Sequence, residues 1–116
     1  MNKLKMDLTI GGKNYELPKV STEAYLNYLD VREPIEEKEE NGRLYTRKDF
    51  YAMADALVEL YGNQFTREQL LAADGLTPGE VIVKFSAVES VLVDQVDKSV
   101  AELKETFTPA VTSKTS

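Results

Sequence analysis

The amino-acid sequence predicts a mainly α fold, in which an N-terminal β-hairpin is followed by about four helices, the last one long. Three observations support this prediction. Apolar and polar residues alternate near the N-terminus, as they do in a half-buried hairpin. Three Thr residues then stand at positions typical of helix N-caps. Finally, no helix-breaking residue lies between Gly79 and Pro109.

The length of the chain predicts a single globular domain over residues 1–107. A chain of 116 residues is near the usual size of one domain, and 42% hydrophobic residues are enough to build one core. A chain this short buries a smaller share of its surface than a longer one does. We therefore expect it to gain stability from a partner.

The hairpin is predicted over residues 3–17. Its apolar residues recur at every second position on both sides of Gly11-Gly12, which supply the positive φ angles of a tight turn. They are Leu4, Met6, Leu8, Ile10, Tyr15 and Leu17. Pro18 has no N–H to donate and ends the second strand.

A first helix is predicted over about residues 22–33. Ser21 is a suitable N-cap, and Pro34 is expected to stop or kink the helix. The acid-rich sequence "EPIEEKEENGR" that follows predicts a solvated, mobile connector. The apolar stripe of this helix comprises Tyr25, Leu26, Tyr28, Leu29 and Val31.

Each of the next three helices is predicted from a capping box. A Thr hydroxyl accepts a hydrogen bond from an early helix N–H, and an acid or amide three residues later accepts one from the cap N–H. The capping residues are Thr46, Thr66 and Thr77. The predicted helices run over about residues 47–61, 67–73 and 78–107. Gly62-Asn63 and Gly75 are expected to end the first two, with Gly75 in a left-handed conformation.

The last helix is predicted to be longer than a small domain is wide. About 30 residues at a rise of 1.5 Å span roughly 45 Å. One face carries Val81, Phe85, Val88, Leu92, Val96 and Leu103, and Val91, Val93, Val100 and Phe107 widen the stripe or begin a second one. We expect the far end to find nothing to pack against within its own chain. Residues 108–116 have the composition of a disordered tail.

Charge and composition exclude several classes of function. Fourteen basic and twenty acidic residues give a net charge of -6, which opposes binding to nucleic-acid phosphates. The chain has no Cys, and no apolar run reaches the length of a membrane span. The alternating N-terminus does not resemble a signal peptide. We therefore expect a soluble, cytoplasmic protein that binds neither nucleic acid nor a membrane.

The sequence predicts no catalytic residues, no metal ligands and no cofactor. It lacks His, the commonest general base and metal ligand. The acids at 36, 37, 39 and 40 do not have the spacing of a calcium loop, and Gly11-Gly12-Lys13 lacks the other residues of a phosphate loop. The pairs Asp49 with Asp55 and Asp94 with Asp97 lie among surface charges. An enzyme is therefore the least expected class.

Three stretches of the sequence resemble the tail assembly chaperones of long-tailed phages and prophages of Gram-positive hosts. These stretches are "LTIGGKNYELPKVSTEAYLNYLDVREPIEE", "LYTRKDFYAMADALVELYGNQFTREQLL" and "DGLTPGEVIVKFSAVESVL". The resemblance covers roughly residues 7 to 95 and consists of the order of elements and phrases such as "YGNQFT" before the short helix. It implies a small, mostly helical protein of the host bacterial cytoplasm that is absent from the finished virion.

The same resemblance implies the partners of the protein. Members of this family hold the tape measure protein and help to recruit subunits of the major tail tube protein during assembly, and a longer form often arises by ribosomal frameshifting. We expect apolar residues of the last helix to bind amphipathic helices of a tape measure protein, or a neighbouring copy of this chain in a homo-oligomer. The candidate contact residues are Val93, Val96, Val100, Leu103 and Phe107.

Two other functions fit parts of the sequence. A small acidic inhibitor or DNA mimic of a mobile element would need acids dispersed over an exposed surface, whereas here they concentrate in residues 30–40. A structural head–tail joining protein would persist in the finished virion, unlike a chaperone. Neither alternative involves catalysis.

Overall fold

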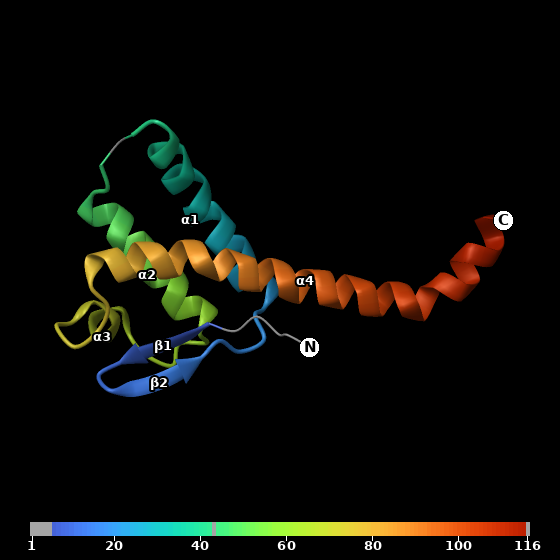
Figure 1. Ribbon diagram of the computed structural model, residues 1–116, viewed down its shortest axis with the longest axis horizontal. Coiled ribbons are helices and arrows are strands. Elements are labelled where there is room, and N and C mark those ends of the chain that lie inside the picture. Colours follow the sequence, from blue (N-terminus) through green and yellow to red (C-terminus); the bar gives the residue numbers. More distant parts are fainter. Residues whose placement is uncertain (1–5, 43, 116) are drawn as a thin grey trace.

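The structure confirms the predicted fold class of a hairpin followed by helices. The computed structural model describes the backbone of residues 6–42 and 44–115, and the side chains of these residues up to Lys104. In this part of the chain an antiparallel hairpin precedes four helices, the last of which is the longest (Figure 1). The elements are β1 (Asp7–Ile10), β2 (Lys13–Glu16), α1 (Thr22–Glu40), α2 (Arg47–Leu60), α3 (Arg67–Leu71) and α4 (Pro78–Thr115).

The hairpin turns at the two glycines that the sequence indicated. Ile10 pairs with Lys13, so Gly11 and Gly12 form a two-residue loop, with φ angles of 59° and 80°. The Gly11 N–H donates to the carbonyl of Asp74 at 2.9 Å, which ties the turn to the loop after α3. The strands are shorter than the predicted range of residues 3–17, of which residues 3–5 lie outside the described part.

Helix α1 does not end at residue 33 as predicted, and the acidic segment after it is no connector. The helix continues through Pro34 to Glu40. Ile35, only 4% exposed, belongs to the core, and Lys38 forms an ion pair with Asp49 at the start of α2. These contacts outweigh the loss of one helical hydrogen bond at Pro34. Asn41 and Gly42 therefore end a helix, with the Asn41 amide donating to the Glu37 carbonyl at 2.9 Å.

The three predicted capping boxes are present. In each, the Thr hydroxyl accepts from the backbone N–H three residues later, and that residue's side chain accepts from the Thr N–H, as between Thr77 and Glu80 at 3.2 and 2.8 Å. The predicted end of α2 is also confirmed. Gly62 and Asn63 both have positive φ, and the Asn63 N–H donates to the Val58 carbonyl at 2.9 Å.

The role predicted for Gly75 is wrong. Helix α3 already ends at Leu71, short of the predicted residue 73, and Gly75 is not among the residues with positive φ. Instead, the chain returns close to the last turn of α3, where the Leu76 N–H donates to the Leu70 carbonyl at 2.8 Å. A Cβ atom on Gly75 would lie 2.2 Å from that carbonyl oxygen. Position 75 therefore requires glycine because there is no space for a side chain.

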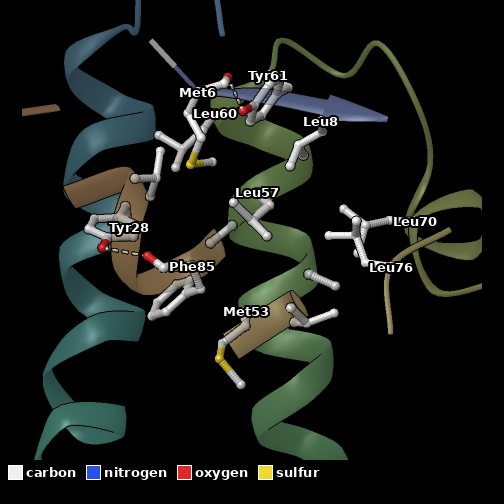
Figure 2. Close-up of a cluster of buried hydrophobic side chains, with 14 of the residues drawn as sticks. Met6, Leu8, Tyr28, Met53, Leu57, Leu60, Tyr61, Leu70, Leu76 and Phe85 are labelled. Atoms are coloured by element: carbon white, nitrogen blue, oxygen red, sulfur yellow. Dashed lines mark hydrogen bonds between the residues drawn. The ribbon is translucent and has the colours of Figure 1, made fainter. Parts of the chain in front are cut away.

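The core gathers around α2, which contacts α1, α3 and α4. Two tyrosine hydroxyls form hydrogen bonds between elements of the core. Tyr28 donates to the Phe85 carbonyl at 2.9 Å, and Tyr61 donates to the Met6 carbonyl at 2.6 Å (Figure 2). Both side chains are fully buried, and burial raises the pKa of both phenols well above the ordinary value. Tyr28 and Tyr61 are therefore both core residues whose hydroxyls are satisfied by backbone carbonyls.

Helix α4 extends past its predicted end at residue 107 and continues to Thr115, where a disordered tail was expected. Pro109 does not end the helix, because a proline removes one backbone hydrogen bond and kinks a helix without necessarily breaking it. Figure 1 shows α4 leaving the other elements and bending near its C-terminal end. This projection accounts for the longest dimension of the molecule, 58 Å.

Candidate partner-binding surface on the last helix

The side of α4 that faces the core ends at Leu92. Val81, Phe85, Val88 and Leu92 follow the helical repeat and are each no more than 1% exposed. Beyond them, none of the residues 93–104 is buried. Near this boundary, Gln95 connects α4 to the segment before α1 by accepting from the Val20 N–H at 3.4 Å. From here on, α4 lies outside the globular part of the molecule.

The predicted contact residues lie on this projecting part. Val93 and Val96 are each 42% exposed, Val100 is 43% exposed and Leu103 is 59% exposed. Phe107 is within α4, but its side chain lies outside the described part of the chain. We call the apolar positions Val93, Val96, Val100, Leu103 and Phe107 the α4 stripe.

The α4 stripe overlaps the face of α4 that enters the core and widens it to one side. At 100° per residue, its described members centre roughly 70° around the helix axis from the core-facing residues. Val96 and Leu103 continue the predicted face of Val81 and Phe85, because Leu103 lies about five turns after Phe85. Both are exposed, since this part of α4 has left the core. A spacing of alternately three and four residues keeps the stripe on one side of the helix.

Two opposite charges border the α4 stripe, and sequence reasoning missed them. Asp97 directly follows Val96, and Lys104 directly follows Leu103, so both occupy the same position relative to the apolar residues. Both side chains are exposed. The signal in the sequence was this repeat of an apolar residue followed by a charged one at an interval of seven.

Other apolar side chains are exposed away from the α4 stripe. They are Leu26 on α1, Leu44 before α2 and Val83 near the start of α4. Leu26 was predicted to join the apolar stripe of its helix, but it is 52% exposed. The other residues predicted for this stripe do face the core: Tyr28 is buried, and Tyr25, Leu29 and Val31 pack half-buried against the core, together with buried Ala24 and Ile35.

Two of the carboxylates considered for catalysis, Asp49 and Asp55, have structural partners. Asp49 completes the capping box of α2 and pairs with Lys38. Burial raises the pKa of this carboxyl, but the hydrogen bonds from Lys38 and Thr46 lower it more, so it lies below the ordinary value. Asp55 accepts two hydrogen bonds from the Arg67 guanidinium, at 2.8 and 2.9 Å. The two groups thus serve separate ion pairs.

The described residues form neither a cluster of metal ligands nor a membrane-spanning helix. Within this part of the chain, no three or more Asp and Glu residues come together as a group that could hold a metal ion. None of the helices described combines the length and apolar character needed to cross a membrane. The α4 stripe is therefore the surface that we consider for function.

Comparison with known proteins agrees with a role in binding other proteins. A family model described as "Phage tail chaperone protein" matches residues 1–108. The match includes the hairpin, α1 to α3 and all five positions of the α4 stripe. Neither the search of curated proteins nor that of solved structures finds a match.

Proposed function

Because this chain belongs to the phage tail chaperone family, we propose that its α4 stripe binds amphipathic helices of the tape measure protein during tail assembly. In the same proposal, the bound chaperone helps to recruit major tail tube subunits. It acts in the host cytoplasm, without catalysis, and is not retained in the finished virion. The tail assembly role itself follows from the family.

The observation that carries the proposal is the exposure of the α4 stripe. Four apolar side chains lie on one side of a helix that has left its own core. An apolar helix face of this kind recognises a second amphipathic helix by burying both faces together. Full burial of one Val or Leu side chain stabilises a complex by about 1.5–3 kcal/mol before the costs of association are subtracted.

The same geometry suits a contact that must later be released. The α4 stripe consists of three valines, a leucine and a phenylalanine, and it lacks Trp, Tyr and Arg, the residues that most often anchor tight interfaces. The part of α4 that carries the stripe projects away from the other elements (Figure 1) and contains no buried residue from 93 to 104, so its occupation does not require the core to open. Growing tube could therefore displace the chaperone without unfolding it.

Substitution of both central valines tests the proposal. We expect Val96→Asp with Val100→Asp to reduce co-purification with the tape measure protein at least tenfold, because two charges would enter an apolar contact. A matched control is Ser90→Asp with Ala101→Asp, which adds the same charge. Both control positions are exposed and lie roughly 110° around α4 from the stripe.

Folding controls separate a loss of binding from a loss of structure. Both double variants should keep the circular dichroism spectrum and the urea midpoint of the wild type, because none of the four side chains is buried. Undiminished co-purification of the Val96→Asp, Val100→Asp variant would reject the α4 stripe as the binding surface. An equal loss in both variants would show that added charge, and not this face, matters.

A further inference from the structure

The α4 stripe has the spacing of a coiled-coil seam. Its positions are separated by three, four, three and four residues, which matches the a and d positions of two successive heptads. In this notation Val93, Val100 and Phe107 are at a, and Val96 and Leu103 are at d. Asp97 and Lys104 then both occupy e, beside the seam.

An antiparallel pairing of two copies of α4 makes this seam self-complementary. In antiparallel coiled coils an a residue faces a d residue of the other helix, so Val100 faces Leu103 of the second copy and Val96 faces its Phe107. The e positions of the two helices lie beside each other in this arrangement. Asp97 therefore meets Lys104 of the second copy, and two-fold symmetry repeats the pair at the other end.

A parallel pairing lacks this complementarity. There the e positions approach g positions, which here are Leu92, Ser99 and Thr106, so neither Asp97 nor Lys104 meets an opposite charge of the second copy. A parallel pairing would also bring both globular parts to the same end of the seam. Figure 1 shows the globule around the N-terminal half of α4, so antiparallel copies would instead hold their globules at opposite ends.

We propose that a second copy of this chain occupies the α4 stripe in an antiparallel, two-fold symmetric dimer. The seam from Val93 to Phe107 is about 22 Å long. A two-helix contact only two heptads long buries less surface than the roughly 1,200–2,000 Å² of a typical stable interface, so we expect the dimer to dissociate readily. Self-association covers the apolar face when no other helix is bound.

Charge reversal at the e positions tests this arrangement in the full-length protein. Asp97→Lys places a lysine opposite Lys104 of the other copy, and Lys104→Asp places two acids together, so each single variant should dimerise about three- to tenfold more weakly. The double variant restores opposite charges and should dimerise like the wild type. A 1:1 mixture of the two single variants should form a heterodimer by the same rule.

Sedimentation equilibrium at low salt, over roughly 10 μM to 1 mM protein, measures each association. The differences between variants should shrink in about 0.5 M salt, because the charges are exposed and screened. A wild type that stays monomeric at 1 mM, or single variants that dimerise as the wild type does, would overturn the proposal. A double variant no better than the single ones would overturn the antiparallel alignment.

The dimer and the proposed partner binding can fail separately. The charge variants leave all apolar residues of the α4 stripe in place, so co-purification with the tape measure protein should persist while dimerisation weakens. Conversely, a dimer that forms as described while the valine variants co-purify normally would leave this inference standing and remove the proposed function.

Discussion

Gly75 shows how a single residue can be required for a reason that its sequence context does not reveal. Gly after a short helix usually indicates a left-handed C-terminal residue. Here the requirement is space, because a Cβ atom would lie 2.2 Å from the Leu70 oxygen and 2.5 Å from the Gln69 oxygen. Both are backbone atoms, which cannot rotate away as a side chain can.

Gly75→Ala should therefore lower the free energy of unfolding by about 2–3 kcal/mol, because the α3–α4 loop must shift to admit the methyl group. Gly79→Ala is the matched control. Nothing lies within 4 Å of a Cβ atom at Gly79, in the first turn of α4, so this change should leave stability unchanged or raise it by up to about 1 kcal/mol. Urea denaturation would compare the variants, and equal stabilities would contradict the close approach at Gly75.

At the scale of elements, α1 departs most from its local sequence rules. Pro34 is exposed inside the helix, and the acidic residues around it favour solvent. The second half of the helix is held by Ile35 in the core and by Arg32, which pairs with Glu89 of α4 at 2.9 Å. Tertiary contacts therefore determine the length of this helix.

This explanation predicts that Pro34→Ala stabilises the protein. Alanine restores one helical N–H and removes the clash of the proline ring, which together cost about 3 kcal/mol in a helix interior, while the unfolded chain gains freedom worth up to about 1 kcal/mol. We expect a net increase of about 1–2 kcal/mol in the free energy of unfolding, measured by urea denaturation. A decrease would show that Pro34 makes a contribution that its exposed position does not explain.

At the scale of the whole molecule, the main feature is that the first part of α4 is packed in the core and the later part projects into solvent. Residues 81–92 pack against the core, whereas residues 93–104 contain no buried side chain. Most helical stability comes from packing of an apolar face rather than from intrinsic propensity. The two parts of one continuous helix should therefore differ in local stability.

Hydrogen exchange would measure this difference. In dilute protein, amides of residues 85–92 should exchange at least about a hundredfold more slowly than those of residues 96–104, because only the first group requires the core to open. Raising the protein concentration or adding a tape measure helix should protect the second group and leave the first unchanged. Uniform slow exchange along residues 85–104 in dilute protein would mean that the projecting part is covered by its own chain.

By itself, the sequence determined where each helix begins and where the hairpin turns. Capping boxes and a Gly-Gly turn involve groups only a few residues apart, so their chemistry is readable locally. It also indicated the five positions of the α4 stripe through their helical spacing. Only the tertiary structure decided that α1 passes Pro34, that Gly75 is confined by α3, and that the core side of α4 stops at Leu92. Each of these depends on which distant segment comes close, because burial and free space belong to the packed molecule and not to a local pattern.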